Sequence, residues 1–350
     1  MSTVLLWACA LASAGPVTVT VISATYLRGA LAGLAAMSIW ASWSAITRFA
    51  VTTNLDAWDI GALRFGIAGL ALIPVVVSRG LALECLGWSG LAIMLAGGGV
   101  PYVLLAATGL HFAPAYDQGA LNPGCMPLLV ALLSRECLTG ARKFGQMLII
   151  AAVLIVVVGH AVHWSGARLV GDVLFLGASL LWASFVVVMR GARLDPLHAV
   201  AIVALGSLVG YVPIYLVWRG VRLLAAPLDA ILLQAVFQGV LVTIVSLLLF
   251  GRAMARLGAS GAAAFGAGVP ALSGLIAIPL LGEWPSRADW AAIGLITAGV
   301  YLASGGPVPG PAGRRISTPA RDCSASLAMT AGVLRFRAGR WRSRRQGRAG

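Results

Sequence analysis

Long apolar runs, separated by short polar connections, fill most of this sequence. Ten of these runs are comparable in length with the roughly 20 residues that a helix needs to cross hydrocarbon. They cover residues 29–49, 58–78, 86–108, 114–134, 144–163, 171–190, 196–218, 230–251, 259–281 and 288–304. The pattern predicts an all-α polytopic membrane protein with ten transmembrane helices and no inserted soluble domain.

Composition agrees with this prediction. Hydrophobic residues make up 60% of the chain and charged residues only 10%, against about 25% charged residues in an average soluble domain. Most of the charged residues cluster between the apolar runs and few fall inside them. A soluble protein is therefore excluded, and we expect the lipid bilayer to be the first partner of this chain.

The two halves of the sequence repeat each other. Short motifs recur at offsets of 139 to 147 residues: Trp40-Ala41-Ser42 as Trp182-Ala183-Ser184, Leu55-Asp56 as Leu194-Asp195, Pro74 as Pro213, and Pro123 with Glu136 as Pro270 with Glu283. The repeats cover residues 29–163 and 171–305, with five spans each. Because five is odd, the second repeat enters the membrane from the opposite side, which is the inverted architecture of secondary transporters.

The two ends of the chain differ from the repeats. Residues 1–28 form a leader of uncertain order, for which an eleventh span is an alternative. Residues 306–350 carry ten arginines against one aspartate, a charge of +9. This tail is either a disordered cytoplasmic extension or a segment attracted to anionic lipid. It contains no recognisable nucleic-acid-binding module, so we expect no nucleic-acid partner.

Basic residues also indicate the orientation of the chain. Connections on one side of the predicted bundle hold nine arginines and lysines, and those on the other side hold five. Because cytoplasmic loops carry the excess of such residues, we expect a multi-pass protein of the inner or plasma membrane with both termini in the cytoplasm.

Several of these motifs resemble those of a known family. Trp40-Ala41-Ser42-Trp43 and Arg48-Phe49 in the first span, followed by Ala62-Leu63-Arg64-Phe65 in the second, are similar to the opening of an EamA domain. The Pro-to-Glu spacing that ends each half resembles the same domain. The resemblance implies two tandem EamA repeats of the drug/metabolite transporter superfamily, whose bacterial members are ten-helix inner-membrane proteins that export amino acids and other small metabolites.

Two charged residues inside the spans are candidates for function, because an ionisable group at membrane depth needs a cavity or a partner. Arg64 either binds an anionic group such as a carboxylate or extends to the interface. Asp117 is a candidate for proton coupling, since desolvation favours the neutral form of a carboxyl group. The alternatives are a salt bridge with a neighbouring Arg64 or a water-exposed position at the start of its helix.

Aromatic and amide side chains provide the other candidates for substrate binding. Trp40 and Trp43 lie on one face of the first span, and Trp182 lies on the sixth span. Tyr116 stands beside Asp117 at a place where many members of the family are wholly apolar. Gln238 shares a face of the eighth span with Gln234, and it either donates hydrogen bonds to the substrate or hydrogen-bonds a neighbouring helix. Such walls suit a small amphipathic ligand.

The sequence contains no pattern for a cofactor or a metal. Its five cysteines and four histidines show no metal-ligand spacing, and no nucleotide-binding loop is present. We therefore predict no cofactor, no metal and no enzymatic activity. The expected function is secondary transport of a small molecule, most simply export of an amino acid or a related compound by alternating access. The alternative is a membrane enzyme acting on lipid or prenyl groups through Asp56 and Asp59. The oligomeric state is left open.

Overall fold

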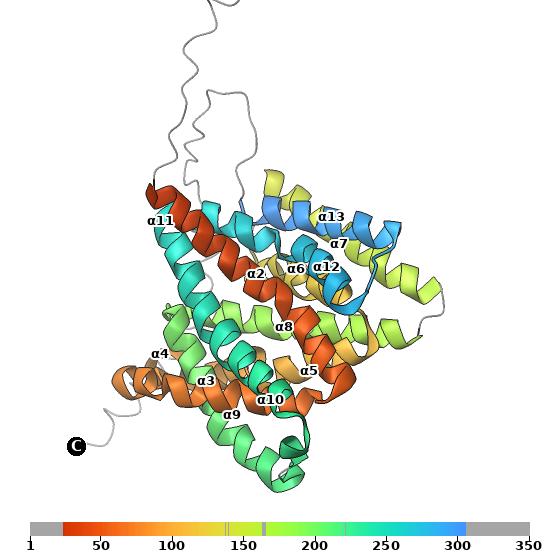
Figure 1. Ribbon diagram of the computed structural model, residues 1–350. Coiled ribbons are helices and arrows are strands. Elements are labelled where there is room, and N and C mark those ends of the chain that lie inside the picture. Colours follow the sequence, from red (N-terminus) through yellow and green to blue (C-terminus); the bar gives the residue numbers. More distant parts are fainter. Residues whose placement is uncertain (1–23, 137, 139, 163–165, 221, 306–350) are drawn as a thin grey trace, which may run out of the picture. The chain divides into compact units, whose positions relative to one another are not determined.

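The computed structural model describes residues 24–136, 138, 140–162, 166–220 and 222–305, and within these ranges it contains helices and no strand (Figure 1). The first repeat forms α2 (Ala24–Thr53), α3 (Ala57–Arg79), α4 (Leu83–Gly98), α5 (Val100–Phe112), α6 (Ala115–Leu133) and α7 (Gly140–Val162). The second forms α8 (Gly166–Gly191), α9 (Pro196–Arg219), η1 (Arg222–Ala225), α10 (Leu228–Gln234), η2 (Ala235–Val245), α11 (Ser246–Ala267), α12 (Val269–Leu281) and α13 (Arg287–Ala303). Residues 24–28 of the predicted leader belong to α2, and the predicted tail lies outside the described residues.

All ten predicted spans are helical, but fewer than ten meet a strict test of length and hydropathy. Seven helical stretches in the described ranges pass this test, and a bent pair formed by Gly261–Ala267 and Val269–Leu281 makes an eighth candidate. The two that do not pass are α6, which carries Asp117, Gln118 and Asn122, and α13, which has 17 residues. The structure thus confirms a polytopic helical protein, while the count of ten spans stays a prediction.

Two of the predicted spans are broken, and proline accounts for both breaks. Gly99 separates α4 from α5, and Gly268 separates α11 from α12, with a proline near the start of the following helix in each case. Proline lacks the N–H that would continue the hydrogen-bond ladder of the preceding turn. Within the eighth predicted span, η2 is an 11-residue π-helical stretch between two α-helical ones.

The repeated Leu-Asp motif marks equivalent helix starts. Asp56 caps the N-terminus of α3 and forms a capping box with Asp59. Asp195 caps α9 by accepting hydrogen bonds from the backbone N–H groups of Leu197 and His198. These side chains satisfy N–H groups that the first helical turn leaves without partners, which explains why both halves keep an aspartate at this position.

Helix packing follows the same duplication. Three pairs of equivalent helices are in extensive contact across the two repeats: α3 with α9, α6 with α12, and α7 with α13 (Figure 1). In addition α2 packs on α11 and α12, and its counterpart α8 packs on α4, α5 and α6. Each contact of a first-repeat helix thus has an equivalent contact made by its second-repeat counterpart. The described helices are therefore related by an approximate two-fold symmetry.

Two reciprocal ion pairs show that α3 and α9 run antiparallel. Arg79, at the end of α3, lies 3.3 Å from Asp195 at the start of α9. Arg219, at the end of α9, contacts Asp56 at the start of α3, although not in hydrogen-bond geometry. The C-terminus of each helix therefore meets the N-terminus of its counterpart. If both helices cross a bilayer, the two repeats are inverted in it.

Close contact between α3 and α9 depends on a glycine. A Cβ atom added at Gly69 would lie 2.6 Å from Cβ of Leu208 and 2.9 Å from the backbone oxygen of Ala204, whereas one added at Gly66 on the same helix would meet nothing within 4 Å. Small residues of this kind let membrane helices approach closely.

We expect Gly69→Ala to destabilise the protein by about 1–3 kcal/mol, because α3 and α9 must move apart to accept the methyl group. Thermal unfolding in detergent measures this effect. Gly66→Ala is the matched control and should be neutral or stabilising, since alanine favours the helix. Equal unfolding temperatures for the two variants would show that this contact does not hold the repeats together.

Candidate functional site

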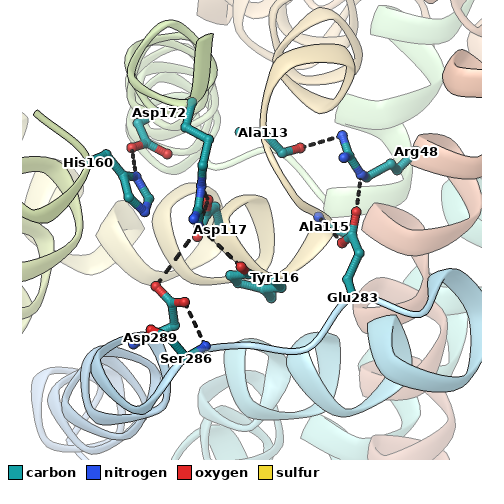
Figure 2. Close-up of polar contacts among 11 residues, drawn as sticks. Arg48, Ala113, Ala115, Tyr116, Asp117, His160, Asp172, Glu283, Ser286 and Asp289 are labelled. Atoms are coloured by element: carbon teal, nitrogen blue, oxygen red, sulfur yellow. Dashed lines mark hydrogen bonds and ion pairs between the residues drawn. The ribbon is translucent and has the colours of Figure 1, made fainter. Parts of the chain in front are cut away.

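A polar cluster lies where α2 and α7 end and where α6, α8 and α13 begin. Its side chains are those of Arg48, Tyr116, Asp117, His160, Arg168, Asp172, Glu283 and Asp289 (Figure 2). We call this group the end cluster. Because the contributing helices alternate in direction, residues far apart in the sequence reach the same end of the bundle.

Asp117 lies at the centre of the end cluster and pairs with Arg168. Its side chain is 2% exposed and accepts a 2.9 Å hydrogen bond from Nη2 of Arg168. The same guanidinium donates to the hydroxyl of Tyr116 and lies 4.0 Å from Asp289. The predicted water-exposed position of Asp117 is therefore wrong, and its cationic partner is Arg168 on α8, not Arg64.

His160 and Asp172 form a second buried pair beside Asp117. Nδ1 of His160 and Oδ2 of Asp172 are 2.6 Å apart, and Oδ1 of Asp172 is buried without a hydrogen-bond partner among the described residues. Ligand atoms of Asp117, His160 and Asp172 all lie within 4.8 Å of one another. Two carboxylates and an imidazole suit either a bound metal ion or an exchangeable proton, and burial favours arrangements that limit net charge.

Glu283 joins the loop before α13 to two other helices. Its carboxylate forms an ion pair with Arg48 on α2 and accepts a 2.8 Å hydrogen bond from the backbone N–H of Ala115, the first residue of α6 (Figure 2). Arg48 also donates to the backbone oxygens of Leu110 and Ala113 at the end of α5. A single carboxylate thus caps α6 and ties α2 to the second repeat.

Trp40, Trp43 and Gln238 connect α2 to the eighth predicted span. Nε1 of Trp43 donates to Oε1 of Gln238 at 2.7 Å, and the amide of Gln238 donates to the hydroxyl of Thr47. Nε1 of Trp40 donates to the hydroxyl of Ser246. In this conformation their polar atoms are engaged in hydrogen bonds between helices, which is the alternative that the sequence left open for Gln238.

Arg64 lies apart from the end cluster, with aromatic and amide groups near it. It is 6% exposed, so it does not extend to the interface. Its guanidinium lies in the neighbourhood of Tyr102 of α5, whose hydroxyl accepts a 3.2 Å hydrogen bond from Asn122 of α6. The ring of Tyr102 packs on that of Trp182, with centroids 4.9 Å apart. The structure therefore brings two predicted residues, Arg64 and Trp182, towards the same tyrosine.

Comparison with known proteins identifies the family. The sequence profile of the EamA-like transporter family matches residues 27–159 and 169–305, one match for each repeat. The chain belongs to this family. A solved structure titled only "Crystal structure of protein" is similar in fold, with a TM-score of 0.50 and 19% sequence identity over 79% of this chain and 95% of that chain. Membership supports a membrane transporter of the drug/metabolite transporter type and gives no support to the enzyme alternative.

The acidic pair on which the enzyme alternative rested has a structural role in this EamA-like chain. Asp56 and Asp59 form the capping box of α3. Asp59 also accepts a 2.5 Å hydrogen bond from the hydroxyl of Tyr215 on α9. Both carboxylates therefore stabilise the start of α3 and its contact with the second repeat.

A pocket of about 420 Å³ in the EamA-like fold lies away from the predicted substrate residues. It is lined by small and aromatic residues of α11, α12 and α13, among them Ala271, Gly294, Trp290 and Tyr301. None of the residues that the sequence predicted for substrate binding lines it. Size alone does not identify a solute site, and the buried ionisable groups lie at Arg64 and in the end cluster.

The sequence did not single out four residues of the end cluster: His160, Arg168, Asp172 and Asp289. Their separations in the sequence match no metal-ligand or ion-pair spacing, because each reaches the cluster only when α7, α8 and α13 pack around the start of α6. A weak signal was available, since each is an ionisable residue at the edge of an apolar run.

Proposed function

We propose that this protein is a secondary transporter that exports a small organic compound, such as an amino acid or a related metabolite. Ten helices in two inverted five-helix repeats would cross the inner or plasma membrane, with both termini in the cytoplasm. The observation that carries the proposal is the reciprocal pairing of α3 with α9 in a chain whose repeats both match a transporter family. Inverted repeats of this kind place the substrate site between them.

We test the function by transport itself. The protein is purified, reconstituted into proteoliposomes, and assayed for uptake of a panel of labelled amino acids and organic acids against empty vesicles. We expect saturable movement of at least one compound, driven by an opposing gradient. Movement that is no faster than in empty vesicles for the whole panel, with correctly inserted protein, would contradict the proposal.

An asymmetry between the repeats supports alternating access. Arg48 and Arg190 occupy equivalent positions in the two repeats, because each follows the tryptophan of the recurring Trp-Ala-Ser motif at the same distance. Glu283 and Glu136 are equivalent in the same way, since each follows the matched proline at the same distance. Arg48 and Glu283 form an ion pair, whereas Arg190 and Glu136 are both exposed and share no ion pair among the described contacts. One end of the bundle thus has an ion pair that its symmetric counterpart lacks in this conformation.

If each repeat adopted the conformation that the other has now, this asymmetry would be reversed. When the pair formed by Arg48 and Glu283 opens, Arg190 and Glu136 would come together at the opposite end. Each pair would then stabilise one of two states of the transporter, and a solute bound between the repeats would be exposed to one side at a time.

We expect Glu283→Gln and Glu136→Gln to shift accessibility in opposite directions. With the native cysteines replaced by serine, labelling of Gln118→Cys near the end cluster by an impermeant maleimide should accelerate several-fold in Glu283→Gln. Loss of about 1 kcal/mol from one state changes the ratio of states about fivefold. Glu136→Gln is the matched change at the twin position and should slow the labelling. Shifts in the same direction, or none, would refute the exchange of ion pairs.

Asp117 is our candidate for coupling transport to protons. The groups that face it are Tyr116 on its own helix, His160 of α7, Arg168 and Asp172 of α8, and Asp289 of α13. Arg168 favours the ionised carboxylate, while burial favours the neutral acid. Uptake of a proton by Asp117 would release Arg168 and weaken the link that it makes between α6, α8 and α13.

Asp117→Asn should therefore abolish the dependence of transport on a pH gradient and leave exchange of labelled for unlabelled substrate intact. The asparagine mimics the neutral acid at every pH, so the cluster no longer gains or loses this proton. Flux is measured with and without a pH gradient, with Asp195→Asn as the control at an exposed helix cap where asparagine is equally suitable. Retention of the wild-type response in Asp117→Asn would exclude the coupling role.

A further inference from the structure

Arg64 is a buried cation without a counter-charge. No ion pair joins it to any acidic residue in the described ranges, and its Nε is buried without a hydrogen-bond partner. Its cation–π contact is with the ring of the adjacent Phe65, at 5.7 Å. The acids nearest to it in sequence, Asp56 and Asp59, are occupied by helix capping and by α9.

Such a cation is costly at membrane depth, and arginine cannot lower the cost by losing its proton. The guanidinium keeps its charge in proteins, and an unpaired charge in a low-dielectric interior destabilises the fold by several kcal/mol. A residue of this kind marks a functional site when the protein gives it no partner, and a bound ligand can then supply the missing charge. The sign of the charge then defines the ligand as an anion.

Tyr102 provides a second hydrogen-bond donor without an acceptor. Because its oxygen accepts from Nδ2 of Asn122, its own hydroxyl hydrogen is free to point elsewhere, and no acceptor for it is found among the described residues. A hydroxyl group carries one donor in addition to its lone pairs. Arg64 and Tyr102 therefore offer donors in the same neighbourhood, and a carboxylate has two oxygens that accept such bonds.

The position of Asn122 is itself held by a neighbouring helix. Its backbone oxygen accepts a 2.8 Å hydrogen bond from the hydroxyl of Ser179 on α8. One turn further along α8, Trp182 packs against Tyr102 and also against Phe185, at a centroid distance of 5.2 Å. These three rings form an apolar and aromatic wall beside the two donors, which suits the non-polar body of a small molecule.

We propose that the substrate is a monocarboxylate with an aromatic or bulky apolar body, and that Arg64 and Tyr102 bind its carboxylate. The proposal deepens the transport function and rests on it. The acids nearest to Arg64 in sequence are occupied by helix capping and by α9, and no acid pairs with Arg64 in the described ranges. An ammonium group therefore has no identified carboxylate partner here, and a plain carboxylate suits the site better than a zwitterion or a cation.

The test uses three probes of nearly the same shape and different charge: phenylacetate, the neutral phenylacetamide and the cationic phenethylamine. Binding to the purified full-length protein is measured by thermal stabilisation, and movement by uptake into proteoliposomes. We expect phenylacetate to stabilise the protein and the other two to have little effect, because only the carboxylate accepts from both donors.

Arg64→Gln should weaken phenylacetate binding at least tenfold, and Arg64→Lys should weaken it less. Arg79→Gln is the matched control on the same helix, at an exposed ion pair worth little to stability, and should bind as the wild type does. Arg64→Gln should also unfold at a higher temperature than the wild type without ligand, because it removes an unpaired buried charge. A purely structural role for Arg64 predicts the reverse.

The inference is overturned if phenylacetamide or phenethylamine stabilises the wild type as well as phenylacetate does, if no probe stabilises it, or if Arg64→Gln and Arg79→Gln bind alike. These outcomes leave the transport function standing wherever another compound moves across the vesicle membrane. The opposite failure is also visible: phenylacetate that binds through Arg64 but never crosses the membrane would uphold the anion site and contradict transport.

Discussion

A charge inside hydrocarbon requires a partner of opposite sign, and the described part of this chain is arranged around that requirement. Water is absent from the bilayer core, so each ionised group must be neutralised by the protein, by a ligand or by a proton. Asp117 meets this condition through Arg168, and Glu283 meets it through Arg48. Arg64 does not. The exception is informative because these two ion pairs show that the fold can supply a partner of opposite charge.

The same requirement explains why the inverted arrangement is self-consistent. An aspartate at a helix N-terminus and an arginine at its C-terminus each suit the dipole of their own helix. When a helix of this kind is duplicated and packed antiparallel on its copy, every terminal aspartate meets a terminal arginine. The contacts of Arg79 with Asp195 and of Arg219 with Asp56 follow from this geometry. One pattern in the ancestral repeat thus generates two contacts between the repeats.

The sequence was sufficient for the repeats, the helical class and the helix starts, because each leaves a local signal. The Leu-Asp motif is local: Asp56 and Asp195 bond to N–H groups two or three residues away. Partners across the bundle leave no such signal. The sequence allows Arg64 as a neighbour of Asp117, but the packing of α8 against α6 puts Arg168 in this place. The mutual hydrogen bond of Trp43 and Gln238 depends on α2 lying against η2, which no local pattern indicates.

Helix α6 connects the two buried charges that have distinct proposed roles. It carries Asp117 in its first turn and, five residues on, Asn122, which donates a hydrogen bond to the hydroxyl of Tyr102 beside the proposed anion site at Arg64. Pro123 and Pro127 lie inside the same helix just beyond this point, and each removes a backbone N–H from the hydrogen-bond ladder. In the proposed exchange, a proton that enters through Asp117 moves positive charge inward, and a carboxylate that leaves from Arg64 moves negative charge outward. The two movements have the same electrical effect. In a cell with a negative interior, moving one elementary charge across the membrane is worth about 2.3 kcal/mol per 100 mV. The membrane potential would therefore favour both the entry of the proton and the export of the carboxylate.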